Sequence, residues 1–192
     1  ISAFNGKIYV LSKAMTPLVE TVYDRLKEAG NSTIMMQAVD ASGFAHELKT
    51  LRDTVRDALT GDLSVRTYSN TLLNVTDETF QKAGISSLAD LTAKLRENSQ
   101  EVVDDDSLLR EYVGYHILSS DRQTILSGMA SVGTGSSLID TRATNQVIAV
   151  SYDSLATDPE KQLTLNADGN AASFVISGEQ KAKNGYVCEL SS

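Results

Sequence analysis

Apolar residues recur every three or four positions in several stretches of the first two thirds of the chain, which is the spacing of amphipathic helices. The first stretch begins with Thr16, a good capping residue, and with Pro17, which suits a first helical position. Its apolar face consists of Leu18, Val19, Val22, Tyr23, Leu26 and Ala29. Gly30 comes next and is a common helix terminator. The pattern therefore predicts a helix that begins at Pro17 and ends before Gly30.

A second helical pattern lies further along, with apolar residues four, three, four and four positions apart. These residues are Phe44, Leu48, Leu51, Val55 and Leu59. Gly61 follows them and predicts the end of the helix. Between the two helices, residues 34–39 form a short apolar run that predicts a strand, and residues 40–43 predict a turn.

Residues 71–80, Thr-Leu-Leu-Asn-Val-Thr-Asp-Glu-Thr-Phe, have the pattern of a buried strand that runs into a helix. Thr76 is a suitable N-cap for that helix, and Gly84 is placed to close it. Asp77 and Glu78 would then lie in the first turn, where the helix dipole favours acidic side chains. Capping explains the three residues without a ligand, so we interpret them as scaffold.

Two further helices are predicted before residue 118. Ser86 or Ser87 caps the first of them, and Leu88, Leu91 and Leu95 form its apolar face. Asp104, Asp105 and Asp106 stand at the start of the next, which begins near Ser107. Residues 108–118, Leu-Leu-Arg-Glu-Tyr-Val-Gly-Tyr-His-Ile-Leu, predict a short amphipathic helix that is followed at once by a strand.

The remaining patterns are typical of strands and turns. Strands are predicted at 7–11, after the turn pair Asn5-Gly6, and at 63–65, 146–152, 162–166, 173–177 and 186–190. Residues 119–144 are rich in Gly, Ser and Thr and are interpreted as a loop, whose most helical piece is 121–129. Helices gather in the middle of the chain, and strands joined by short connections follow. This order predicts an α+β domain with a largely antiparallel sheet.

Composition and charge narrow the classes of partner. The chain has 192 residues, of which 41% are hydrophobic and 22% charged, so it is long enough and apolar enough to bury a core. Its net charge of -8, with no basic cluster, is unfavourable for nucleic acid and for anionic membrane surfaces. We expect no nucleic-acid partner and no membrane insertion, because no apolar run approaches the ~20 residues of a spanning helix.

Candidate chemistry is sparse. Cys188 is the one cysteine, which excludes an intrachain disulfide and a CxxC site. His46 and His116 are 70 positions apart and belong to no zinc motif, and Asp104 to Asp106 lack the alternating ligands and glycine of a calcium loop. No Gly-x-Ser-x-Gly nucleophile turn is present. We therefore expect no catalytic residue, no metal and no cofactor.

Three regions resemble, in the same order, the signature regions of fasciclin-like domains. The first is 71–80, which is similar to the family's Thr-Val-Phe-Ala-Pro-Thr-Asp-Glu-Ala-Phe, with Thr71, Thr76, Asp77, Glu78 and Phe80 in register. The second, 115–118, resembles Leu-Leu-x-Tyr-His-Val-Leu, and the third, 184–190, resembles Asn-Gly-Val-Ile-His-Val-Ile-Asp. Val75 stands where the family usually has proline, and Cys188 where it often has histidine. The chain thus resembles a divergent member.

The resemblance implies a fasciclin-like wedge-shaped antiparallel β-sandwich with packed helices over residues 18–192. It also implies a non-enzymatic adhesion or interaction module, extracellular or at the cell surface, whose partner is an extracellular protein, a matrix component or a glycan. Residues 1–17 resemble the tail of a preceding repeat or form an N-terminal strand, so a tandem fasciclin-like neighbour is expected. The alternative is a small-molecule or carbohydrate-binding domain of an exported surface protein, with its pocket in residues 119–144.

The second region is also the candidate binding site. In the fasciclin-like family this region has been associated with adhesion, so the resemblance implies binding residues at Tyr115, His116, Ile117 and Leu118. From the residue types alone, a histidine where a helix meets a strand is more commonly a partly buried residue whose ring hydrogen-bonds the backbone. Sequence leaves both interpretations open.

Overall fold

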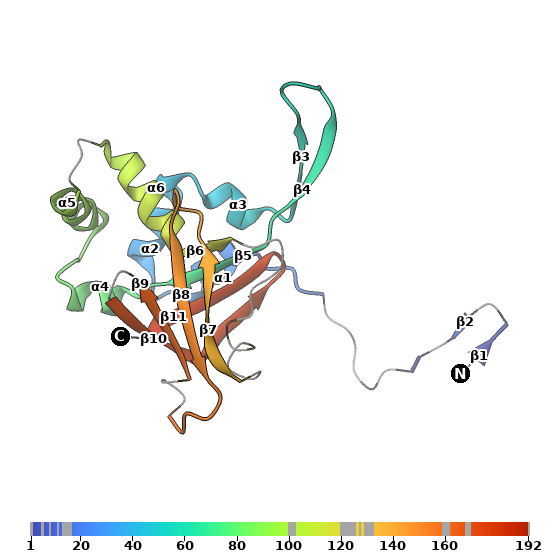
Figure 1. The fold of residues 1–192 in the computed structure, drawn as a ribbon. Helices are drawn as coiled ribbons and strands as arrows, with labels where there is room; N and C mark the ends of the chain where they lie inside the picture. The colour runs from blue at the N-terminus through green and yellow to red at the C-terminus, as the bar shows by residue number, and fades with distance from the viewer. Residues whose placement is uncertain are drawn as a thin grey trace.

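The computed structural model describes residues 17–99, 103–119, 133–158, 162–167 and 170–191, together with residues 2–4, 6, 7, 9, 10, 12, 126 and 128 (Figure 1). The helices are α1 (Val22–Ala29), α2 (Thr33–Ser42), α3 (Ala45–Lys49), α4 (Asp77–Lys82), α5 (Leu88–Asn98) and α6 (Asp105–Tyr115). The strands are β1 (Ser2–Ala3), β2 (Gly6–Lys7), β3 (Arg52–Arg56), β4 (Leu63–Thr67), β5 (Asn70–Asn74), β6 (Ile117–Ser119), β7 (Thr134–Asp140), β8 (Val147–Asp153), β9 (Leu163–Ala167), β10 (Asn170–Ala182) and β11 (Gly185–Ser191).

One large sheet organises the body of the protein. Its seven strands follow the order β6-β5-β11-β10-β9-β8-β7, and every neighbouring pair is antiparallel except β5 and β11, which are parallel. The register of β10 against β11 shifts between Phe174 and Glu179, and such an irregularity bends a strand. The edge strand β6 also meets the end of β7 through a single bridge between Leu118 and Thr141.

Two hydrophobic cores lie on opposite faces of the central strands. In β5, Leu72 packs into the core shared with the helices, whereas its neighbour Leu73 packs into the core formed with β8 and β9. Val187 and Cys188 divide in the same way on β11. Successive side chains of a strand point to opposite faces, so these two strands are covered on both sides. The predicted α+β class, with a largely antiparallel sheet and packed helices, is confirmed.

Helix α1 begins later than predicted. Thr21 is its N-cap, because the Asp24 N–H donates to Thr21 Oγ1 at 3.3 Å and the Asp24 carboxylate accepts from the Thr21 N–H at 2.8 Å. This reciprocal capping box fixes the start at Val22, so the start predicted at Pro17 is wrong. The predicted end is confirmed, since Gly30 is left-handed with φ of 68°.

The strand predicted at 34–39 is wrong, because these residues belong to helix α2. Its buried side chains Ile34, Met35, Ala38 and Val39 recur with the helical period and pack into the core shared with the other helices. Its N-cap residue, Ser32, makes no side-chain hydrogen bond to the N–H groups of the first turn. Asp77, at the start of α4, accepts from the backbone N–H groups of Thr33 and Ile34 instead. Contacts from a distant element therefore complete this helix.

The helix predicted from Phe44 to Leu59 is correct only in its first part. Helix α3 ends at Lys49, and the chain then forms the hairpin β3–β4. Val55 and Leu59 are 40% and 97% exposed, so their helical spacing does not mark a buried face. The strand predicted at 63–65 is confirmed as part of β4. Figure 1 shows this hairpin projecting from the body of the protein.

The loop predicted at 119–144 also needs correction. Residues 134–140 lie in the stretch interpreted as a loop, yet they form β7 and pair along their whole length with β8. Their exposure alternates, with Ile139 partly buried. Residues 121–129 fall outside the described residues except Leu126 and Gly128, and Leu126 is fully buried.

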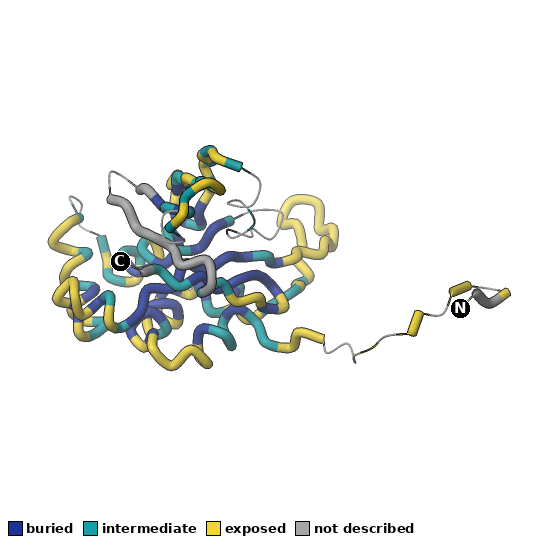
Figure 2. Tube along the Cα trace, turned by 90° about the horizontal axis from the view of Figure 1, so that it is seen from below, coloured by how far each residue is buried: buried dark blue, intermediate teal, exposed yellow. Residues whose placement is uncertain are grey.

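The strand predicted at 7–11 is wrong at Tyr9 and Val10, which follow β2 without strand structure and are 78% and 81% exposed. Among the described residues of this stretch, Gly6 and Lys7 pair with the two residues of β1. This small hairpin lies apart from the seven-stranded sheet (Figure 2). Such a short pairing offers Tyr9 and Val10 no apolar surface to cover, and strand formation depends on that packing.

Candidate interaction surface

The first signature region is built into the scaffold. Thr76 Oγ1 accepts from the Thr79 N–H at 3.3 Å and caps α4, as predicted. The Asp77 N–H donates to the Asn31 carbonyl at 2.8 Å, and the Asp77 carboxylate caps α2. Phe80 is 3% exposed and lies in the core shared by the helices and the sheet. These residues join β5, α2 and α4.

Helix α6 carries the second signature region to the edge of the sheet. Asp104 caps it, accepting from the Ser107 N–H at 2.9 Å, and His116 ends it immediately before β6. The aspartates at 104–106 therefore lie at a helix start, as predicted. Ile117 and Leu118 are 0% and 1% exposed, so neither side chain can reach a partner in this state. Tyr115 and His116 are half-buried.

The His116 ring is held by its own helix. Its Nδ1 lies 2.9 Å from the carbonyl oxygen of Tyr112, and its ring centroid lies 4.5 Å from that of Tyr112 and 6.1 Å from that of Tyr115. Burial lowers the pKa of His116 from its ordinary 6.5, and the hydrogen bond to Tyr112 opposes that shift only in part. A neutral, backbone-bonded ring matches the structural interpretation of this histidine.

A shallow groove of about 600 Å³ opens beside these rings, between α5, α6 and the turn that joins β7 to β8. The residues that line it are Leu95, Asn98, Ser99, Leu108, Glu111, Tyr112, Tyr115, Ala143 and Gln146. Apolar and aromatic surfaces thus lie beside amide, hydroxyl and carboxylate groups. This mixture of an apolar floor and a few polar groups is typical of recognition sites. Tyr115 is the one predicted site residue that lines the groove.

The wall contributed by the β7–β8 turn is fastened to α6. The Thr144 N–H and hydroxyl donate to the Glu111 carboxylate at 2.9 and 2.6 Å. The Arg142 N–H donates to the Gly114 carbonyl at 3.0 Å. A Cβ at Gly114 would lie 2.9 Å from the Ala143 nitrogen, so glycine permits this close approach. The two walls of the groove are therefore held in a fixed relation.

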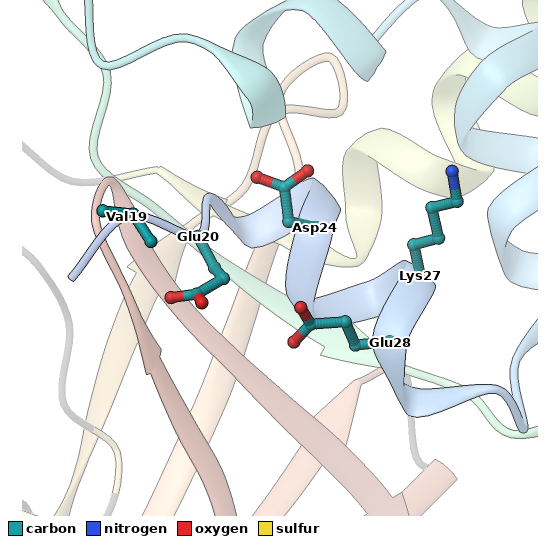
Figure 3. Close-up of a pocket in the computed structure, with 5 residues that line it drawn as sticks. All are labelled: Val19, Glu20, Asp24, Lys27 and Glu28. Atoms are coloured by element: carbon teal, nitrogen blue, oxygen red, sulfur yellow. The ribbon is translucent and has the colours of Figure 1, made fainter.

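A second hollow of about 240 Å³ lies beside the start of α1 and is lined by Val19, Glu20, Asp24, Lys27 and Glu28 (Figure 3). Its acidic groups already have structural partners: Asp24 belongs to the capping box of α1, and Glu20 and Glu28 lie 3.5 and 3.4 Å from Arg25. In Figure 3 the charged ends of Asp24 and Lys27 point away from those of Glu20 and Glu28. The charged groups of this hollow therefore do not converge on a common ligand position.

Across the ranges that the structure describes, no three His, Cys, Asp or Glu side chains come together as a metal site would require. His46 lies on α3 with its Nε2 3.3 Å from Asp53, and His116 lies at the end of α6. Cys188 is buried, and burial together with Glu179 raises the pKa of its thiol. No described helix is long and apolar enough to cross a membrane.

Comparison with known proteins supports the fold. No family model matches the chain, and no curated protein matches its sequence. Among solved structures, a FAS1 domain pair from the insect cell adhesion molecule fasciclin I is similar, with a TM-score of 0.56 and 11% sequence identity. The match covers 99% of this chain and 55% of the other, so the chain spans about half the length of that domain pair. The fasciclin-like fold that the three regions implied is thereby confirmed.

Sequence reasoning missed most of the groove. Tyr112 precedes Tyr115 by three positions, so helical spacing alone places both on one face of α6, and that signal was available. Ala143 belongs to the segment proposed for a ligand pocket in the alternative interpretation. No local signal indicates that the β7–β8 turn reaches α6, because the contact depends on how the whole sheet folds.

Proposed function

We propose that this protein is a non-enzymatic adhesion or interaction module that works outside the cell or at its surface. Its partner is an extracellular protein, a matrix component or a glycan, and the α5–α6 groove is the binding surface. The observation that carries the proposal is the position of Tyr115, which belongs to the second signature region and lines this groove with Tyr112. The tyrosine ring supplies a large, rigid contact area, which suits recognition.

The fold favours the same class of function. The similar domain pair comes from a cell adhesion molecule, and we extend that role to this chain as part of the proposal. Residues 18–192 would then be one fasciclin-like domain, with residues 1–17 as the tail of a preceding repeat in a tandem array. Export, for example as a lipoprotein, is part of the same proposal.

Binding of the purified protein to matrix proteins, to cells and to a glycan array tests the proposal. We expect saturable binding to at least one of them and at least about tenfold weaker binding by Tyr115→Ala, because interface tyrosines often contribute more than 1 kcal/mol. Tyr9→Ala is the matched control, since Tyr9 is 78% exposed and far from the groove in sequence and fold. Circular dichroism establishes that each variant is folded. Absence of saturable binding, or equal binding by Tyr115→Ala, would contradict the proposal.

A small-molecule or carbohydrate ligand is the second candidate. The groove volume of about 600 Å³ falls in the range of small-ligand sites, and Asn98 and Gln146 could orient a polar ligand. Thermal unfolding across a panel of glycans and metabolites separates the two candidates, because a saturating small ligand raises the midpoint. A shift that Tyr115→Ala abolishes would favour this candidate over an adhesion surface.

A further inference from the structure

The hairpin β3–β4 is a regular two-stranded sheet that stands away from the body of the protein (Figure 1). Its five residue pairs run from Arg52 opposite Thr67 to Arg56 opposite Leu63 without a bulge. All residues of the hairpin except Asp53 are exposed. A two-stranded sheet with both faces in water is only marginally stable. A sheet of three or more strands with an apolar face can be stable by itself.

The turn of the hairpin is nevertheless held by several hydrogen bonds. Asp57 Oδ1 accepts from the backbone N–H groups of Leu59 and Thr60, both at 2.8 Å. The Asp57 N–H donates to the Asp62 carbonyl at 2.8 Å, and Arg56 donates to the Gly61 carbonyl at 2.7 Å. The hydrogen bonds to the Thr60 and Leu59 N–H groups lower the pKa of Asp57. The hairpin is thus a built element with a fixed register.

The register shows which backbone groups face outward on β4. At one end of the hairpin the Asp57 N–H donates to the Asp62 carbonyl, and at the other the Tyr68 N–H donates to the Leu51 carbonyl. Between these two ends, every second pair of opposite residues is hydrogen-bonded. By that alternation, Ser64 and Arg66 direct their N–H and C=O groups toward β3. Leu63, Val65 and Thr67 direct theirs outward, away from the hairpin. These three residues form the open edge of β4.

We propose that the open edge of β4 pairs with the same edge of a second copy of this chain. The two β4 strands would run antiparallel about a two-fold axis at Val65, so that Val65 lies opposite Val65 and Leu63 opposite Thr67. All three outward-facing residues on each strand then form backbone hydrogen bonds. The two hairpins become one four-stranded sheet. Because both copies use the same edge, the assembly stops at two chains.

Side chains on one face of this sheet support the pairing. Leu63 and Val65 are 63% and 68% exposed in the monomer and lie on the same face of β4, two positions apart. In the dimer the two Val65 side chains meet at the centre, flanked by the two Leu63 side chains. Pairing thus brings the exposed apolar side chains of the two copies into contact across the axis and covers part of their surface.

Charges select β4 rather than β3. The one charged residue of β4, Arg66, would lie opposite Ser64 of the second copy, and its guanidinium is 3.8 Å from Glu47 in its own chain. The corresponding pairing of two β3 strands about Thr54 would place Arg52 opposite Arg56 twice. Like charges directly opposite each other destabilise a strand pair. The β4 edge is therefore the compatible one.

Sedimentation velocity of the full chain over a wide range of concentration tests this dimer. We expect a reversible monomer–dimer equilibrium, and Val65→Lys should raise the dimer Kd at least about tenfold because it brings two ammonium groups together at the axis. Thr54→Lys is the matched control: it adds the same charge to the same face, but at the far edge of the hairpin. It should leave the Kd within about twofold, since the added charges lie beyond a Debye length across the four-stranded sheet. Thermal unfolding of both variants shows that the fold is kept.

Three results would overturn the proposal. One is a wild-type chain that stays monomeric at the highest concentration. Another is a dimer whose Kd Val65→Lys leaves unchanged. The last is a dimer that Thr54→Lys dissociates while Val65→Lys does not, which would assign the contact to β3. The dimer does not depend on the α5–α6 groove, so its failure would leave the proposed adhesion function untouched.

Discussion

The carboxylate of Asp77 accepts a 3.0 Å hydrogen bond from the backbone N–H of Ile34, 43 positions earlier in the chain. Its other oxygen accepts from the Thr33 N–H at 2.9 Å. Asp77 is the first residue of α4, yet it caps the positive end of α2. One acidic residue of the first signature region thereby fixes two helices relative to each other.

Replacing this cap should destabilise the protein. Asp77→Ala removes both acceptors, and we expect the free energy of unfolding to fall by about 1–2 kcal/mol, as for other N-cap losses. Glu78→Ala is the control, because the Glu78 side chain is 79% exposed and pairs only with Lys82 among the ion pairs of the described residues. Urea unfolding should give a loss below ~0.5 kcal/mol for the control. Equal losses would contradict the capping role.

The same residue predicts a pH dependence. Partial burial raises the pKa of Asp77, but the hydrogen bonds from Ile34 and Thr33 outweigh burial, so its pKa lies below the ordinary 3.8. The unfolded chain then binds a proton at a pH where the folded chain does not, and the stability from Asp77 is lost as the pH falls through this window. Between about pH 5 and pH 2, Asp77→Asn should therefore lose less unfolding free energy than the wild type. Parallel curves would rule this linkage out.

Gly185 allows the third signature region to approach β5. Its φ is 151°, and a Cβ there would lie 1.7 Å from the Asn70 carbonyl oxygen. Gly185→Ala should cost more than about 3 kcal/mol or prevent folding, because backbone cannot give way as a side chain can. Gly84→Ala should cost only about 1 kcal/mol, since Gly84 is left-handed but has open space around it. Similar urea midpoints for the two variants would disprove the close approach.

Phe80 is expected to be one of the larger contributors to the helical core. It is 3% exposed, so Phe80→Ala should lower the free energy of unfolding by about 3–5 kcal/mol. Phe4→Ala is the matched control, because Phe4 is fully exposed and should change stability by less than ~0.5 kcal/mol. A loss below ~1 kcal/mol for Phe80→Ala would be incompatible with a packed ring.

His116 should titrate below its ordinary pKa of 6.5, because burial disfavours the charged ring. Nuclear magnetic resonance of the ring protons measures this directly. The unfolded chain takes up this proton at a higher pH than the folded chain, so the contribution of His116 to stability is lost as the pH falls below about 6.5. A ring that titrates at or above 6.5 would mean that the His116 ring is open to water.

Local capping signals predicted the helices of the middle region well. Thr76 and Ser87 cap α4 and α5, and Asp104 caps α6, each through a side-chain oxygen that accepts from a backbone N–H three residues later. These hydrogen bonds join residues close in sequence, so the sequence contains both partners. The strands β8, β9 and β11 were also predicted, because each combines a short run of apolar or β-branched residues with a flanking turn.

The failures arose where distant contacts decide the local structure. Helix α2 receives its cap from Asp77, and its apolar residues would suit a strand as well as a helix. The residues after Leu48 have helical spacing, but Val55 and Leu59 are exposed, so burial does not enforce a helix there. In the candidate site, Tyr115 could be selected from sequence. Gln146 could not, because the fold of the sheet brings the β7–β8 turn to α6.

The central position of β11 has a consequence for biosynthesis. This strand is the last in the described chain, and it pairs with β5 on one side and β10 on the other, with residue 185 opposite residue 70. Residues 185–189 must leave the ribosome before they can pair with β5 in the middle of the sheet. Until then Leu72 and Leu73 of β5 have no neighbouring strand on the β11 side. The sheet is therefore completed late in synthesis and does not grow strand by strand in chain order.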